Sequence, residues 1–198
     1  MSLYQRIRAC IQKIRLSTRL RQDFENACML HKIKPKMLLR DNQTRWNSTL
    51  KMLERLSELR KPFELLRRNE TSLNKFSVSD AEWEFIDEMI KFLKPFEHVT
   101  LLLSKSTSPT MSLSAAVYIE LFNHLESFTP QKHCSGIVKA AASACSKLNK
   151  YYPQTDSAVY VIGLVLDFRC KFDWYRTVGI SEDIVKANKK EVISKWKT

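Results

Sequence analysis

The stretch DNQTRWNSTLKMLERLSELRKPFELL, residues 41–66, decides the fold class of this chain. Its apolar residues recur three or four positions apart, which is the spacing of one face of an α-helix. We therefore predict a long amphipathic helix that begins at Asn47 or Ser48 and is kinked at Pro62, because proline removes a backbone donor. The expected buried face consists of Leu50, Leu53, Leu56, Leu59, Phe63 and Leu66.

The preceding 40 residues continue the helical pattern. A basic amphipathic helix is predicted from the recurrence of Leu3, Ile7, Ile11 and Ile14. Ser17 is placed to cap a second helix, which should end near His31, before the Lys34-Pro35 step. The short apolar run at residues 37–39 is compatible with a strand within residues 37–40, but three residues do not decide this.

The chain after residue 66 is also predicted to be helical. Residues 69–77 are polar and predict a loop, and Ser79 with Glu82 has capping-box spacing, so a helix should begin near Asp80. Pro95 should kink or break that helix. Further helices are expected from Ser112 or Ser114, over 137–152, and from a cap at Ser181 toward Trp196, while residues 157–166 could be helix or strand. The fold class is therefore mainly α, a bundle of six to eight helices with at most one or two short strands.

Composition excludes several classes of protein. The chain has 198 residues, of which 44% are hydrophobic and 27% charged, and it contains only 3 glycines. These values exclude a disordered tail and a collagen-like chain. No apolar run approaches the roughly 20 residues of a membrane span, and residues 1–10 lack the apolar centre of a signal peptide. We expect an intracellular protein with no membrane partner.

Positive charge is concentrated in the first third of the chain. The net charge is +12, and residues 1–68 hold 17 Lys and Arg against 6 Asp and Glu. Residues 69–198 are almost neutral, with 16 against 15. A basic segment joined to a neutral one favours a polyanionic partner. The alternative is that these charges only keep the surface soluble.

No enzyme or metal site can be assembled from the residues alone. The five cysteines show no Cys-x-x-Cys spacing, and the four histidines lie singly along the chain. Phosphate-binding glycine loops and the motifs of hydrolases and metalloproteases are missing from the sequence. We expect no cofactor, no metal, no small-molecule substrate and no catalytic activity.

Residues 41–55, DNQTRWNSTLKMLER, resemble the D-x-x-T-R-W-N-S-T-x-x-M-L-x-R block of hAT-superfamily transposases. Weaker elements of the same family's pattern follow the same order along the chain. Residues 14–24 resemble I-R-x-S-x-x-R-x-x-x-F, with Leu20 at the position of the second arginine, and the pattern W-x-x-I, P-F, T and L-S of a family helix is similar to residues 83–104. Similar matches occur at Pro109-Thr110, at KLNKYY (147–152), and at LDFRCK (166–171), where Phe168 stands in place of the family's proline.

The resemblance implies a specific origin for the chain. hAT transposases have an RNase H-like core that binds divalent metal through two Asp and one Glu, with a large helical domain inserted into it. The motifs that carry these metal ligands do not occur in this sequence. We therefore predict a fragment or decayed copy in which residues 1–40 are a remnant of the core and residues 41–198 form the helical insertion-like domain, without catalytic activity and with a nuclear location.

The resemblance also selects candidate DNA-binding residues. In the family this tryptophan, here Trp46, is associated with a flipped base near the excision site, and an indole can return part of the lost stacking energy. The adjacent Arg45 can contact phosphate, and Lys51 and Arg55 lie one turn apart on the same predicted helix. Arg15 and Arg19 are further candidates on the preceding basic helices. The alternatives are an apolar role for Trp46 at the helix start and a solvated face for the cations.

Three functions therefore remain open from the sequence. The first is DNA binding by a transposon-derived fragment through its basic face and the Thr-Arg-Trp-Asn-Ser-Thr block. The second is a helical protein-interaction or oligomerisation module, whose partner would be a second copy or an intact transposase chain. The third is an enzyme whose missing metal ligands come from another chain. DNA binding through Lys and Arg weakens steeply with salt, which separates the first function from the second.

Overall fold

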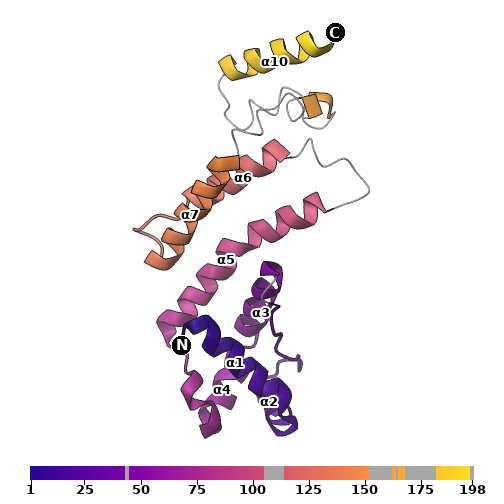
Figure 1. Cartoon of the computed structure of the whole chain (residues 1–198). Coiled ribbons are helices and arrows are strands. Elements are labelled where there is room, and N and C mark those ends of the chain that lie inside the picture. Colours follow the sequence, from indigo (N-terminus) through magenta and orange to yellow (C-terminus); the bar gives the residue numbers. More distant parts are fainter. Residues whose placement is uncertain (43–44, 105–113, 152–161, 164, 168–181, 197–198) are drawn as a thin grey trace. The chain divides into compact units, whose positions relative to one another are not determined.

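The structure is a computed structural model that describes residues 1–42, 45–104, 114–151, 162–163, 165–167 and 182–196. Within these residues it is helical with no strand, so the prediction of a mainly α fold is confirmed. Figure 1 shows the elements in chain order. They are α1 (Leu3–Leu16), α2 (Thr18–Leu30), α3 (Trp46–Glu58), α4 (Arg60–Asn69), the 3₁₀ helix η1 (Thr71–Phe76), α5 (Asp80–Leu103), α6 (Ser114–Glu126), α7 (Ser135–Tyr151) and α10 (Glu182–Trp196).

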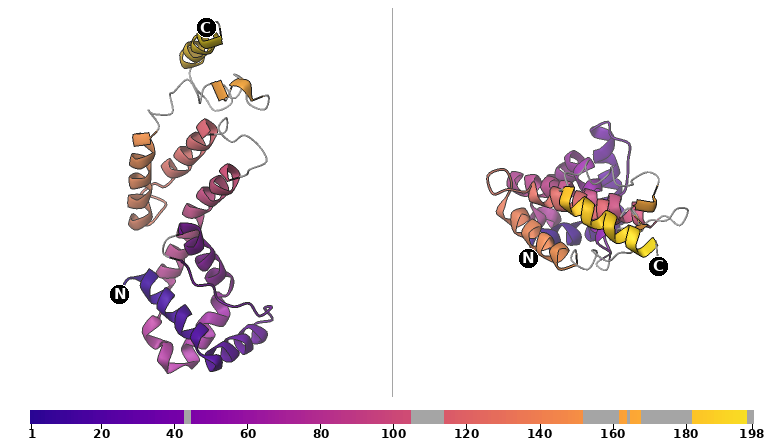
Figure 2. Two further views of the ribbon diagram at one scale, coloured as in Figure 1. Left: turned by 45° about the vertical axis from the view of Figure 1, so that its right-hand side comes forward. Right: turned by 90° about the horizontal axis from the view of Figure 1, so that it is seen from above.

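The chain divides into two compact units, Met1–Lys94 and Pro95–Thr198. The first unit contains α1 to α4, η1 and the first part of α5 (Figures 1 and 2). Its core contains buried residues from both sides of residue 40. The origin of residues 1–40 as a remnant of a catalytic core stays a prediction.

The first two helices begin at serine caps. Ser2 accepts a hydrogen bond from the Gln5 amide at 3.3 Å, and the Gln5 side chain accepts from the Ser2 amide at 3.0 Å, which completes a capping box. Ser17 caps α2 as predicted, by accepting from the Leu20 amide at 3.3 Å. The α2 helix ends at Leu30, next to the predicted end at His31, and Lys32 follows in a left-handed conformation with φ of 55°.

One hydrophobic core holds the first unit together. Helix α2 packs on α4 and on α1, and η1 packs against α4 and α1. Trp83 of α5 lies edge-on to Phe63 of α4, with ring centroids 6.1 Å apart. Its indole nitrogen donates to Glu64 at 3.2 Å, so a large apolar ring is buried with its polar group satisfied. The other large, fully buried side chains are Phe24, Ile7, Ile11, Ile14, Leu38, Leu50, Met52, Leu56, Leu59 and Leu73.

The long helix predicted over residues 47–66 is two helices. Helix α3 begins at Trp46, with Arg45 as its N-cap and no side-chain capping bond, so the predicted start at Asn47 or Ser48 is wrong by one or two residues. The break lies at Leu59, which is both the C-cap of α3 and the N-cap of α4. Pro62 lies in the first turn of α4, where a missing backbone donor has little effect. The predicted kink at Pro62 is therefore displaced to Leu59.

The loop predicted over residues 69–77 is also wrong in part. Residues 71–76 form η1, and two of its apolar side chains, Leu73 and Phe76, are buried in the core. Residues 69–77 contain more polar than apolar side chains, which is why the sequence pattern predicts a loop. Two residues at i and i+3 suffice to anchor one short 3₁₀ turn, whose side chains at this spacing share one face.

The prediction for α5 is confirmed at its start. The Ser79 amide donates to the Glu82 carboxylate at 3.0 Å, and the Glu82 amide donates to the Ser79 hydroxyl oxygen at 3.3 Å. The helix runs through Pro95 to Leu103, so Pro95 does not break it. The division between the two units falls immediately before Pro95.

In the second unit α6 packs on α7, and α6 begins at Ser114 as predicted. Val99, Val117 and Leu121 form a small core, with Leu148 of α7 packed against it. Helix α7 begins at Ser135, two residues before the predicted Ile137. The predicted cap at Ser181, the family match at 168–171 and most of the 157–166 segment lie outside the described residues.

Candidate nucleic-acid interface

The candidate site lies where the chain enters α3. A single hydroxyl holds this entry together: Ser48 Oγ accepts from the Asn42 amide at 2.7 Å and lies within hydrogen-bond distance of two carbonyls, 2.6 Å from Arg45 and 2.9 Å from Asn42. The Arg45 amide in turn donates to the Asn42 carbonyl at 2.9 Å. These bonds tie Asn42 and Arg45 to Ser48 in the first turn of the helix, so the backbone of Arg45 and Trp46 is held at this point.

The residue before this turn, Asp41, is a buried anchor. Its side chain is 0% exposed, and the Arg8 guanidinium donates to Oδ1 at 2.8 Å. The other carboxylate oxygen accepts from the Tyr4 hydroxyl, with the Thr49 hydroxyl 3.4 Å away. Burial, followed by the bond to Asp41 and its negative charge, raises the pKa of the Tyr4 hydroxyl. Asp41 thus ties the start of α3 to α1, which sequence reasoning did not find.

Arg45 and Trp46 face solvent at this entry. Arg45 is exposed and Trp46 is 40% exposed. The buried face of α3 consists of Leu50, Met52, Leu53 and Leu56. An indole this accessible beside an exposed guanidinium can stack on a base while the cation contacts a phosphate.

The other four predicted DNA-binding cations have partners within the protein. Lys51 pairs with Glu54 at 3.0 Å, and Arg19 pairs with Glu70. Arg15 donates to the Leu38 carbonyl at 2.7 Å. Arg55 donates to the Met37 carbonyl at 3.1 Å and lies 3.2 Å from the Glu58 carboxylate. These contacts give Arg15 and Arg55 a structural role in holding the chain between α2 and α3.

That connecting chain, residues 31–45, replaces the strand considered for residues 37–40. Residues 33–42 form no strand or helix, and Leu38 is buried in the core. A strand would have satisfied its carbonyls on a neighbouring strand, whereas here guanidinium groups from α1 and α3 do so. Residues 33–42 therefore present no strand edge.

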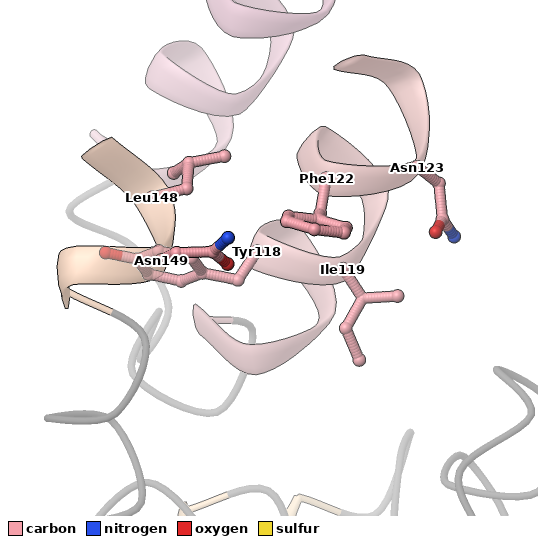
Figure 3. A pocket seen from close by; sticks show the side chains of 6 residues that line it. All are labelled: Tyr118, Ile119, Phe122, Asn123, Leu148 and Asn149. Atoms are coloured by element: carbon pink, nitrogen blue, oxygen red, sulfur yellow. The ribbon is translucent and has the colours of Figure 1, made fainter. Parts of the chain in front are cut away.

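The pocket in Figure 3 lies elsewhere, between α6 and α7 of the second unit. Its lining carries no charged side chain, so it has no means of attracting a polyanion. The residues that line it are Tyr118, Ile119, Phe122, Asn123, Leu148 and Asn149.

Two further features are absent from the described residues. Among them, no His, Cys, Asp and Glu side chains gather in threes or more as ligands of a metal ion. In the same part of the chain, no helix combines the length and the apolar character that crossing a membrane requires.

Comparison with known proteins identifies the first unit. Residues 2–92 match the family model of the ZBED1 RNase-like helical domain. The first unit is similar to the domain of this family over almost its whole length. The match ends within two residues of the unit's boundary at Lys94. It supports the hAT-type transposase origin that the sequence block around Trp46 indicates.

Two curated proteins are similar over a longer stretch. The chain is 30% identical over 157 residues to the "Putative transcriptional regulator tpeD" of Talaromyces stipitatus, which covers 77% of this chain and 16% of that protein. It is also 30% identical over 140 residues to the zinc finger BED domain-containing protein DAYSLEEPER of Arabidopsis thaliana, covering 69% of this chain and 19% of that protein. The chain thus spans less than a fifth of the length of either relative. No solved structure matches.

Proposed function

We propose that the chain binds DNA through Arg45 and Trp46 at the entry of α3, without cleaving it. The observation that carries this proposal is the exposure of both side chains on a turn closed by Ser48 and anchored by the buried Asp41. A preorganised aromatic side chain loses little entropy when it stacks on an unpaired base. The excess of positive charge in residues 1–68 would attract the phosphate backbone.

The relatives support this proposal and its setting. One is named a putative transcriptional regulator and the other a BED zinc finger protein. Their names are consistent with a role on DNA in the nucleus, and we propose the same for this chain. Catalysis would require metal ligands that the sequence motifs of the family carry and that this sequence lacks.

The test is binding to a fluorescent DNA hairpin that carries one unpaired base, measured at two salt concentrations. Trp46→Ala should weaken binding by about 5- to 150-fold, the equivalent of the roughly 1–3 kcal/mol that stacking on one base contributes. The matched control is Trp196→Ala, because Trp196 is 81% exposed and lies in the second unit. Equal losses in both variants, or no binding at low salt, would contradict the proposal.

A second function is favoured by one observation. Three large apolar side chains of α1 and α2, Leu16, Met29 and Leu30, are exposed. Contiguous exposed apolar groups are typical of protein-interaction surfaces, and Met29 and Leu30 are neighbours at the end of α2. If the chain fails to bind DNA, a helical interaction module that pairs with a second copy or an intact transposase chain becomes the better proposal, and sedimentation would reveal self-association.

A further inference from the structure

The connector between α2 and α3 concentrates positive charge. Its first ten residues, HKIKPKMLLR (31–40), contain Lys32, Lys34, Lys36 and Arg40 and no acidic residue. All four of these side chains are exposed, whereas Leu38 is buried and Met37 and Leu39 are partly buried. The connector therefore has an apolar side against the core and a cationic side in solvent. In Figure 1 residues 31–42 follow one edge of the first unit from the end of α2.

Several cations of the first unit pair with carboxylates, whereas most of those in the connector do not. Arg6, Arg8, Arg60 and Arg67 each pair with a carboxylate, and so does Lys36 within the connector. In contrast, Lys32, Lys34, Arg40 and Arg45 make no side-chain hydrogen bond or ion pair with any residue that the structure describes. Four cations without an ion pair to the described residues therefore lie within 14 residues of one another.

The backbone of the connector is held in place before any ligand arrives. The Lys32 and Ile33 amides donate to the Met29 and Cys28 carbonyls at 2.9 and 3.0 Å. Farther along, the carbonyls of Met37 and Leu38 accept from Arg55 and Arg15. Pro35 restricts its own φ and the conformation of Lys34. A segment held at both ends in this way loses little backbone entropy on binding.

We infer that the connector is a phosphate-binding strip: Lys32, Lys34 and Arg40 contact phosphates of the DNA strand that continues to Arg45 and Trp46. This inference rests on the proposed function and extends it to residues that neither the sequence pattern nor the relatives single out. The strip reaches the Arg45–Trp46 pair within five residues of Arg40, so the same strand can meet both. Contacts of this kind position DNA without reading its sequence.

The experiment measures how binding of the full chain to the labelled hairpin depends on salt. Each phosphate contact contributes about −0.9 to the slope of log K against log salt for duplex DNA. Replacing Lys32, Lys34 and Arg40 together by Gln should reduce the magnitude of that slope by roughly 2–3. Replacing the two lysines by Arg instead should leave the slope unchanged, because the charge is retained.

The matched control removes the same charge from elsewhere in the same unit. Arg21, Lys61 and Arg68 are exposed and form no ion pair among the described residues. Their replacement by Gln should change the slope by less than about 1. Equal slopes for both triple variants would show an effect of net charge alone and would overturn the inference, as would a wild-type slope in the connector variant. Circular dichroism of each variant shows whether its helices are intact.

Failure of the strip and failure of the proposed function give different results. If the Trp46→Ala variant loses affinity while the connector variant keeps both affinity and slope, the proposed function stands and the strip is wrong. If the wild-type chain binds heparin but not the hairpin, the proposed function and the inference of a DNA-binding strip are both wrong. The basic surface then binds a polyanion other than DNA. A reduced slope in the connector variant, together with a weaker affinity but an unchanged slope in Trp46→Ala, supports both, since an indole displaces no counterion.

Discussion

The guanidinium of Arg15 in α1 donates to the carbonyl oxygen of Leu38 at 2.7 Å, across 23 residues of chain. Leu38 is itself fully buried, so its carbonyl has little access to water. Arg55 does the same for the neighbouring Met37 carbonyl at 3.1 Å. Two cations that the sequence suggested for DNA binding therefore also hold the connector in the position from which Lys32, Lys34 and Arg40 reach solvent.

We expect Arg15→Ala to destabilise the first unit. The variant leaves the Leu38 carbonyl without its charged donor, and loss of such a bond costs about 1.5–3 kcal/mol. Urea unfolding followed by circular dichroism would measure the change in the free energy of unfolding. Arg21→Ala is the control, because the Arg21 side chain reaches, among the residues that the structure describes, only the Thr18 hydroxyl, at 3.3 Å. Equal stability of the two variants would contradict a structural role for Arg15.

Asp41→Asn should be the more severe change. It removes the buried carboxylate that Arg8 and Tyr4 contact, and breaking a buried ion pair on one side costs about 3–5 kcal/mol. Asp23→Asn is the control, since Asp23 forms a more exposed pair with Arg19 at 3.7 Å. Both variants can be compared by thermal unfolding. A melting temperature for Asp41→Asn as high as that for Asp23→Asn would show that Asp41 does not anchor the entry of α3.

Much of the fold follows from hydrophobic periodicity and capping residues. The stripes of α1, α2 and α3, the serine caps and the Ser79–Glu82 capping box all depend on neighbours within one or two turns. Local patterns of this kind are readable in a single sequence. The fold class and the helical course of the chain could therefore be predicted.

The features that were missed depend on distant residues. The break at Leu59 and the burial of Leu73 are determined by packing of α4 and η1 on α1 and α2, which no local pattern encodes. The apolar run at 37–39 is compatible with a strand because its apolar residues indicate burial. The sequence does not reveal which groups donate hydrogen bonds to its carbonyls. Those groups are side chains located 23 residues before and 18 residues after it.

The candidate site was predictable only in part. The sequence block identified Arg45 and Trp46, and both are exposed in the structure. It gave no reason to separate the connector cations from Arg15, Arg19, Lys51 and Arg55, because net charge does not reveal which cations are already paired. The run of four cations without an acid in residues 31–40 was the available signal.

The Cys10 thiol should be unreactive in the folded chain. Cys10 is fully buried in α1, and burial raises the pKa of its thiol to about 12. Because the thiolate is the reactive form, iodoacetamide at pH 8 should label Cys134, which is half-buried, well before Cys10. Mass spectrometry of digested samples would give the two rates. In urea Cys10 should react as a normal thiol, and equal labelling of Cys10 before and after unfolding would contradict its burial.

Stability of the first unit should fall at acid pH, partly through Glu82. The Ser79 amide donates to the Glu82 carboxylate and Arg6 pairs with it, and these contacts lower the pKa of Glu82 below 4.5. A group whose pKa is lower in the folded state stabilises the fold above its unfolded pKa, and this contribution is lost as the pH falls through the folded pKa. The same holds for Glu58, whose pKa is lowered mainly by its hydrogen bond to Lys36.

We therefore expect Glu82→Gln to reduce the difference in the free energy of unfolding between pH 7 and about pH 3. The variant should lose stability at pH 7, where the wild-type carboxylate is charged, and lose little more on acidification. Urea unfolding at both pH values measures this difference. Glu84→Gln is the matched control, because Glu84 is exposed two residues away on α5 and forms no ion pair in the described part of the chain. If both variants keep the wild-type pH dependence, the interaction of Glu82 with Ser79 and Arg6 contributes nothing to acid sensitivity.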